Sequence, residues 1–179
     1  TELESSVTTS DTYGGEYTFQ QVYNGVKVLG RSITVSANDS GESDFLHSSL
    51  LATDILKSAN LSKILTAEQA EQAAVNYCKD YGTDGDFSVV SNDTETVIYS
   101  LEDFKTTPVT SYIVHVLGSC TVSEDEYYVD CNLFVNAVNG DIIDGTANSS
   151  SITVTRKNEK GERVNFEAQL SASDNKFYM

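Results

Sequence analysis

The sequence has few of the residues that most catalytic and metal sites require. Its 179 residues include three cysteines, two histidines, one methionine and no tryptophan. Three cysteines are too few for a disulfide scaffold, and no Cys-x-x-Cys spacing indicates a zinc or redox site. There is no His-Glu-x-x-His, no Gly-x-Ser-x-Gly and no glycine-rich phosphate loop. We therefore expect a chain without a catalytic constellation or a metal site of its own.

Basic residues and long apolar runs are also scarce. The 11 lysines and arginines are outnumbered by 27 acidic residues, which leaves a formal net charge of -16. Such a charge repels phosphate backbones and anionic lipids, so we expect neither a nucleic-acid nor a membrane partner. No run approaches the roughly 20 apolar residues that span a bilayer, and we recognise no signal peptide. The abundance of serine, threonine, asparagine and aspartate favours an exported, bacterial protein.

The clearest pattern is a pair of alternating runs within Tyr112–Ile143, joined by the acidic turn Ser123–Glu126. A period of two with turn residues between predicts an antiparallel hairpin with one buried face. Folding it symmetrically about the turn sets Cys120 opposite Cys131. This predicts either a disulfide between them, with Cys78 free, or three buried thiols. The residues expected on the buried face are Tyr112, Val114, Val116, Cys120, Val122, Val129, Cys131, Leu133 and Val135.

Helical patterns lie upstream of this hairpin and are candidates to cover it. Apolar spacing predicts one helix from Phe45 to Lys57 and a short second piece near Ser62. The run Thr66–Gln69 has the form of a capping box and predicts a helix that continues to about Tyr81. Asp80–Asp86 is rich in acidic residues and glycine, as calcium-binding loops are. It departs from the EF-hand pattern, however, so we expect a helix-ending turn there.

The first alternating stretch, Tyr17–Ala37, predicts another hairpin. Asn24-Gly25 provides the residues of a tight turn, and Gly30 marks a bulge or a close backbone approach. The residues before it, 1–16, are rich in serine, threonine and glycine, and we expect them to form a flexible lead-in.

This hairpin also carries a family resemblance. Phe19–Gly30 (FQQVYNGVKVLG) resembles the motif that opens the fungalysin/thermolysin propeptide domain. That motif has an aromatic, two glutamines, Asn or Asp with Gly, two valines framing a proline, and a final aromatic-Gly. Lys27 replaces the usual proline and Leu29 the usual aromatic, and neither change disturbs a strand. The matching positions are Phe19, Gln20, Gln21, Asn24, Gly25, Val28 and Gly30.

A second resemblance covers later strands. Thr96–Leu101, Thr110–Val116 and Leu133–Ile143 are similar, in this order, to three strands of the PepSY module, with Asn136 in place of the usual Asp. That module has a cystatin-like helix wrapped by a curved antiparallel sheet. The two motifs in this order resemble propeptides of thermolysin-like zinc metallopeptidases, over about Tyr17–Asp144.

The resemblance implies an α+β fold with two small antiparallel-sheet subdomains and packed helices. We expect a propeptide-type subdomain over residues 17–65 and a cystatin-like PepSY subdomain over residues 66–145. Residues 146–179 would form a linker and a β-hairpin, with Asp174–Met179 resembling the start of a mature thermolysin-like domain. On that alignment the chain crosses the junction between propeptide and peptidase.

The resemblance also implies a function. A propeptide of a secreted thermolysin-like metallopeptidase acts as intramolecular chaperone and inhibitor of its cognate peptidase domain, which holds zinc, with or without calcium. We hypothesise that an unpaired tail after the last strand enters the active-site cleft. Two alternatives stay open: a free-standing secreted or surface module that binds a peptide or protease in trans, and a degenerate, non-catalytic relative. The residues of the expected tail are Ile142, Ile143, Asp144, Gly145 and Thr146.

Overall fold

The computed structural model is mixed α and β, mostly sheet, with two helices in the part of the chain that it describes. The chain divides into two compact units. The first comprises Thr1–Ser62 and Thr96–Ser111, and the second comprises Lys63–Glu95 and Tyr112–Met179. No described helix is long and apolar enough to cross a membrane. The described residues are 2–11, 14–38, 40–80, 83–90, 93–100, 107–122, 125–148, 151–157, 160–170 and 177–178.

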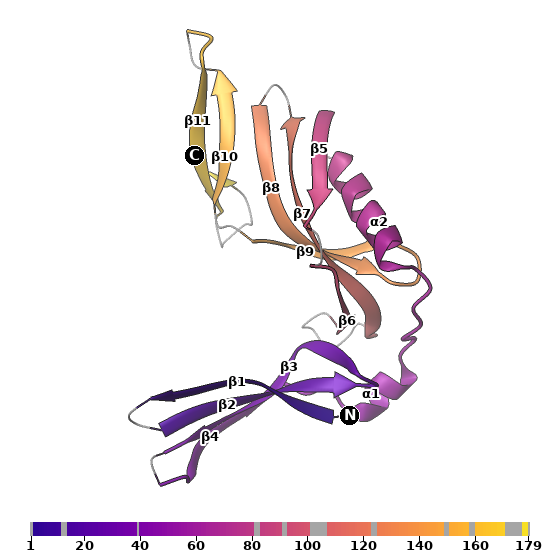
Figure 1. Ribbon diagram of the computed structural model, residues 1–179, viewed down its shortest axis with the longest axis vertical. Coiled ribbons are helices and arrows are strands. Elements are labelled where there is room, and N and C mark those ends of the chain that lie inside the picture. The colour runs from indigo at the N-terminus through magenta and orange to yellow at the C-terminus, as the bar shows by residue number, and fades with distance from the viewer. Residues whose placement is uncertain are drawn as a thin grey trace. The chain divides into compact units, whose positions relative to one another are not determined.

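The sheet of the first unit is built around β3 (Val26–Ala37). β2 pairs along one edge of β3, while the other edge pairs in parallel with β6 and, further along, antiparallel with β4. β1 continues the sheet beyond β2 (Figure 1). A small core packs β3 and β6 against α1. The remaining bounds are β1 (Glu2–Asp11), β2 (Gly14–Tyr23), β4 (Ser43–Ser48), α1 (Thr53–Ser58) and β6 (Glu95–Tyr99), and the core residues are Val28, Leu51, Leu56 and Ile98.

The first unit differs from expectation in four places. The expected flexible lead-in forms β1, whose threonines and valine suit a strand that pairs with β2. The helix expected from Phe45 to Lys57 is divided into β4 and α1. Phe45 and Leu46 are 55% and 65% exposed, so they supply no buried helical stripe. The residues around Ser62 form no helix, and β6, expected in the second module, belongs to the first unit.

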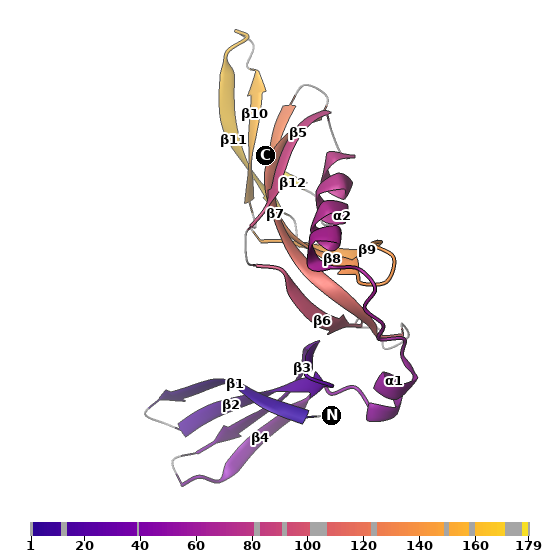
Figure 2. The same ribbon diagram turned by 45° about the vertical axis from the view of Figure 1, so that its right-hand side comes forward.

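The second unit places one helix along one face of a sheet (Figures 1 and 2). The helix begins with the predicted capping box. The Thr66 N–H donates to Gln69 Oε1 (2.9 Å), and the Gln69 N–H donates to Thr66 Oγ1 (3.3 Å). In the sheet, β5 pairs with β7, which neighbours β8, and the far edge of β8 pairs with β9 and β10. The bounds are α2 (Ala67–Lys79), β5 (Thr83–Val89), β7 (Val109–Val122), β8 (Asp125–Asn136), β9 (Ile142–Ala147), β10 (Ser151–Lys157), β11 (Arg163–Leu170) and β12 (Phe177–Tyr178).

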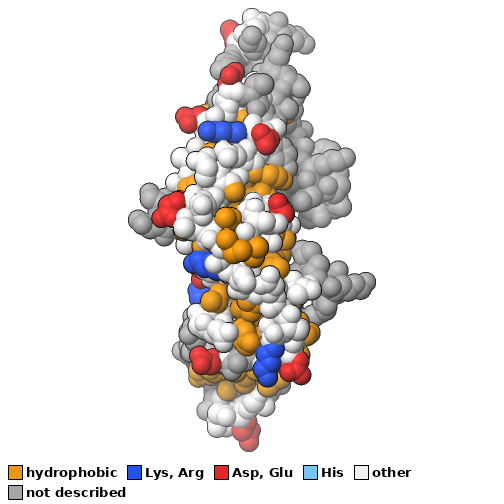
Figure 3. Space-filling model, turned by 90° about the vertical axis from the view of Figure 1, so that its right-hand side faces the viewer, with side chains coloured by type: hydrophobic (Ala, Val, Ile, Leu, Met, Phe, Trp, Pro, Cys, Tyr) orange, Lys and Arg blue, Asp and Glu red, His pale blue; other side chains and the backbone are white. Residues whose placement is uncertain are grey.

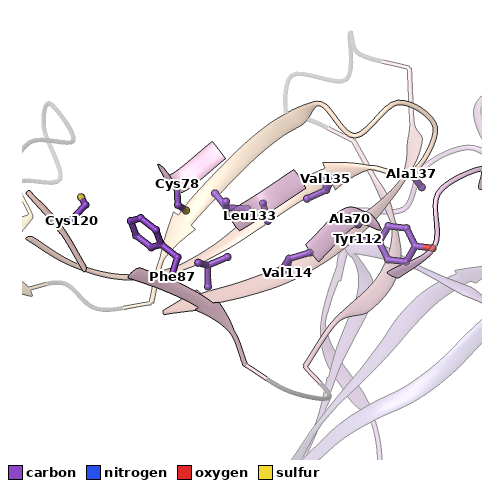
Figure 4. Close-up of a cluster of buried hydrophobic side chains, with 11 residues drawn as sticks. Ala70, Cys78, Phe87, Tyr112, Val114, Cys120, Leu133, Val135 and Ala137 are labelled. Atoms are coloured by element: carbon purple, nitrogen blue, oxygen red, sulfur yellow. The ribbon is translucent and has the colours of Figure 1, made fainter. Parts of the chain in front are cut away.

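One apolar cluster joins α2 to this sheet (Figure 4). Ala70, Ala74 and Cys78 recur every fourth residue, so they lie on one face of the helix, and their small size lets the helix approach the strands. Tyr112 closes one end of the cluster, because its hydroxyl donates to the Leu65 carbonyl (2.7 Å). The predicted alternation is confirmed for the buried β7 and β8 residues Tyr112, Val114, Val116, Cys120, Leu133 and Val135. Val129 and Cys131, predicted on the same face, are half-buried, and the side chain of Val122 lies outside the described part.

The connection between β7 and β8 is shorter than expected. β7 ends at Val122 and β8 begins at Asp125, so Asp125 and Glu126 of the expected turn belong to β8, while Ser123 and Glu124 lie outside the described residues.

Candidate functional site

The propeptide-like motif forms the β2–β3 hairpin. Asn24 and Gly25 have positive φ angles of 51° and 77°, which confirms the predicted tight turn. The β2–β3 register shifts between Gln20 and Val22, so the predicted bulge is present. Gly30, with φ of 67°, lies on β3 within that irregularity and supplies the left-handed conformation that it needs.

Gln20 satisfies backbone groups that the bulge removes from the ladder. Its Nε2 donates to the carbonyls of Val28 (2.7 Å), Arg31 (2.8 Å) and Gln21 (3.1 Å). Carbonyls left without a partner inside a sheet cost about 1–3 kcal/mol each when buried. The Gln20 side chain therefore stabilises the irregular part of the hairpin.

Gln21 ties the same hairpin to the segment before α1. Its side chain is fully buried, its Nε2 donates to the Leu51 carbonyl (2.9 Å), and its Oε1 accepts from the Leu51 N–H (3.0 Å). Val28 packs with Leu51 in the core, and Phe19 is half-buried. The motif residues thus stabilise the first unit. The described side-chain hydrogen bonds of Gln20 and Gln21 are all made to the backbone, and none indicates a ligand site.

The expected inhibitory tail is a paired strand. β9 runs beside β8, with Leu133 opposite Gly145 and Phe134 opposite Asp144. The premise that nothing fixes this segment is therefore wrong. β9 pairs with no other described strand, and the Gly145 N–H donates to the side chain of Asp144 (2.8 Å). The side chains from Asp144 to Ala147 are exposed, so one edge of an extended segment remains open.

An open hollow of about 440 Å³ lies between β9 and the end of α2, and all three cysteines line it. They are free thiols, so the bond expected between Cys120 and Cys131 is not formed in the structure. Cys131 instead donates a hydrogen bond to Cys78, which lowers the pKa of the Cys78 thiol. That bond and burial raise the pKa of Cys131, and burial raises the pKa of Cys120.

On the opposite face of the β7–β8 sheet, two carboxylates hold His115. Its Nδ1 lies 2.8 Å from Asp93 Oδ2, and its Nε2 lies 2.8 Å from Asp130 Oδ1. An ionised carboxylate only accepts, so both bonds form when the ring is a doubly protonated imidazolium. The bonds to Asp93 and Asp130 raise the pKa of His115. Asn148 Nδ2 also donates to Asp130 (2.8 Å), and the bonds from Asn148 and His115 lower the pKa of this carboxyl.

In this clasp, Asp93–His115–Asp130, the central residue is one that the sequence predicts as a surface or edge histidine, because strand alternation places it on the face opposite Val114 and Val116. Alternation correctly placed His115 on the face away from the core, with 21% of its side chain exposed. Asp93 precedes β6, and no local pattern could pair it with His115. The second histidine, His47, is exposed on β4. Among the described residues, no group of three or more His, Cys, Asp or Glu side chains could hold a metal ion.

The strong negative charge is not concentrated on the face drawn in Figure 3. Acidic side chains lie singly there, among basic and polar ones. The described residues in this view therefore form no patch of a single charge sign.

Replacing Gln21 with alanine tests the structural role of the motif. The change leaves the buried N–H and C=O of Leu51 without partners. We expect the free energy of unfolding, measured by urea denaturation, to fall by about 3 kcal/mol. The control Gln72→Ala removes an exposed glutamine of α2 and should change it by less than about 0.5 kcal/mol. Equal effects of the two changes would contradict the role assigned to Gln21.

The clasp predicts a pH-dependent contribution to stability. Because the folded pKa of His115 is raised, this contribution is complete below about pH 6.5 and is lost as pH rises through the folded value. The lowered pKa of Asp130 has the opposite sign, so its share is lost only when pH falls through that lowered value. At pH values between the lowered pKa of Asp130 and about 6.5, we expect His115→Asn to lower the free energy of unfolding by about 1 kcal/mol. The effect is modest because the carboxylates are partly exposed.

Urea denaturation of wild type and His115→Asn across pH measures this difference, and NMR titration of the ring reports the pKa directly. His47→Asn, which removes the exposed histidine of β4, is the matched control and should change stability little. If His115→Asn lowered the free energy of unfolding by more as pH rises above neutrality, the stabilising role of the clasp would be contradicted.

The first unit contains the part of the chain that matches a known family. Residues 3–50 match the family model of the Fungalysin/Thermolysin Propeptide Motif, a span that contains Phe19–Gly30 and ends before α1. A search of curated proteins found no match to the chain. Residues beyond 50, including those that resemble PepSY, lie outside the family match. The first unit therefore carries a fungalysin/thermolysin propeptide motif, which supports a propeptide of a thermolysin-like peptidase.

Proposed function

We propose that this chain acts as an intramolecular chaperone and inhibitor of the peptidase domain of a secreted thermolysin-like peptidase. The observation that carries the proposal is the propeptide motif at residues 3–50. A thermolysin-like parent implies zinc, with or without calcium, in the peptidase domain. The partner of this chain is then that cognate domain.

We assign the second unit to the PepSY type. The support is its one helix packed along one face of an antiparallel sheet, with a buried cluster between them. The last stretch of the resemblance, Leu133–Ile143, contains the end of β8 and a turn at which Gly140 has a φ of 81°. β6 neighbours β7 in the strand order and also pairs with β3, a pairing that the PepSY resemblance does not predict.

The sheet face away from α2 is suited to docking a partially folded domain. Leu117 and Tyr128 are 38% and 49% exposed there, and both line a shallow hollow of about 470 Å³ with Asp130. The clasp fixes β7 to β8 beside them, because His115 and Asp130 belong to these two strands. Apolar side chains on a rigid sheet can bind a partner without the entropy cost of ordering a loop. This face would stabilise the folding intermediate of the peptidase domain.

Inhibition would use β9 as an edge strand rather than as a free tail. The segment Ile142–Ala147 is already extended, and one of its edges pairs with no described strand. An extended segment can add to a strand that borders a cleft, through backbone hydrogen bonds. β9 would occupy the peptidase cleft in this way, and release would require cleavage or degradation of the propeptide.

Lysine substitution on β9 tests this mechanism, because a lysine on an edge strand blocks the approach of another strand. Thr146 is exposed, so Thr146→Lys should change the free energy of unfolding by less than about 0.5 kcal/mol. We expect it to raise the inhibition constant at least about tenfold, which corresponds to about 1.4 kcal/mol of binding free energy. The measurement is inhibition of the activated cognate peptidase domain by the chain added in trans.

The matched control is Ser43→Lys on β4, which makes the same charge change at an exposed strand position of the first unit, outside β9 and the proposed docking face. It should leave the inhibition constant unchanged. Equal inhibition by wild type and both variants would contradict the β9 mechanism, and no inhibition by wild type would contradict the inhibitor role itself.

The limited span of the family match supports a second candidate function. Because the match ends at residue 50, the chain also fits a secreted or surface module that binds a peptide or protease in trans, including one in a non-catalytic relative. Reading the native frame beyond Met179 separates the candidates. A His-Glu-x-x-His with a downstream glutamate ligand supports the propeptide, whereas a stop codon or a continuation without these ligands supports the module.

A further inference from the structure

Three thiols gather around one hollow of the second unit, and the proposed function uses none of them. Cys78 lies in the last turn of α2 and is 6% exposed, and Cys120 on β7 is 4% exposed. Cys131 on β8 is half-buried. All three line the open hollow beside β9, so small reagents can reach them from one side.

Contacts within this group distinguish one pair. Cys78 and Cys131 each shift the pKa of the other thiol, and both line the same hollow, so the two thiols lie close to each other. In Figure 4 the Cys120 side chain lies apart from Cys78, beyond the ring of Phe87. α2 packs on β8 as well as on β5, so joining Cys78 to Cys131 would follow a contact that the fold already makes.

We propose that Cys78 and Cys131 form a disulfide when the chain meets an oxidising compartment, which bonds the end of α2 to β8 covalently. Cys120 remains a reduced, buried thiol. This pairing differs from the Cys120–Cys131 bridge that the sequence predicts, so the two are mutually exclusive. The inference uses the proposed secretion only as the source of the oxidising compartment.

The chemistry needs a small disulfide oxidant such as glutathione disulfide. The Cys78 thiolate, which the bond from Cys131 stabilises, attacks one sulfur of the oxidant and releases one glutathione thiolate. Cys131 then loses its proton and attacks the Cys78 sulfur of the mixed disulfide, which releases the second glutathione. Two electrons and the two thiol protons pass to the two glutathione molecules, and the sulfur–sulfur bond remains in the protein.

The disulfide would stabilise the second unit and hold the end of α2 beside β9. It closes the chain from Cys78 to Cys131, which includes β5, β6 and β7, and so removes conformations from the unfolded state. It also fixes α2 beside the hollow that β9 borders. A propeptide with this bond would resist unfolding until its peptidase removes it by cleavage.

The purified, folded chain incubated with glutathione disulfide provides the test. Thiols counted under denaturing conditions should fall from three to one, because three cysteines are present and one bond uses two. Mass spectrometry of proteolytic fragments from the wild-type protein should join Cys78 to Cys131. Cys120→Ser should oxidise in the same way, whereas Cys78→Ser and Cys131→Ser should form no intramolecular bond.

A Cys120–Cys131 fragment, or three free thiols after oxidation of the folded protein, would overturn the proposal. The midpoint of thermal unfolding is an independent readout that does not depend on a variant folding. Oxidation should raise it by roughly 5–10 °C in both wild type and Cys120→Ser, and a reductant should reverse the change. Because no peptidase is present, this test can fail while the inhibition measurement succeeds, and the reverse also holds.

Discussion

Covering one apolar face of a sheet is the constraint on which the second unit depends. Alternation along β7 and β8 turns every second side chain to the same side, and that side is stable only when another element removes it from water. α2 provides the cover with small residues, Ala70 and Ala74, which bring its backbone close to the strands. Ala137 adds a polar connection, because its carbonyl accepts from the N–H groups of both Ile64 and Leu65 (2.9 Å each).

Features set by short-range chemistry could be predicted from the sequence. The capping box at Thr66 and Gln69 and the turn at Asn24-Gly25 depend on residues within one helical turn or one β-turn, and both are present. The buried parity of β7 and β8 follows from strand geometry alone. The propeptide motif was recognisable for a related reason, since its two glutamines and two glycines lie within one hairpin, where Gln20 and Gly30 serve the same bulge.

Features set by distant segments could not be predicted. The thiol pair joins Cys78 on α2 to Cys131 on β8, and only tertiary packing brings these two elements together. The clasp needs Asp93, which lies 22 residues from His115 in sequence. β9 was misread as a tail because its exposed glycine- and threonine-containing sequence shows no apolar alternation. Pairing with β8 orders it instead.

The most direct test of the chaperone role is refolding of the cognate peptidase domain with and without this chain, added as a separate polypeptide. The chain contains no tryptophan, so tryptophan fluorescence reports on the peptidase domain alone, even while the chain inhibits its activity. We expect the chain to accelerate recovery of the native fluorescence severalfold or more at an equimolar ratio. Identical refolding rates and yields with and without the chain would contradict the account.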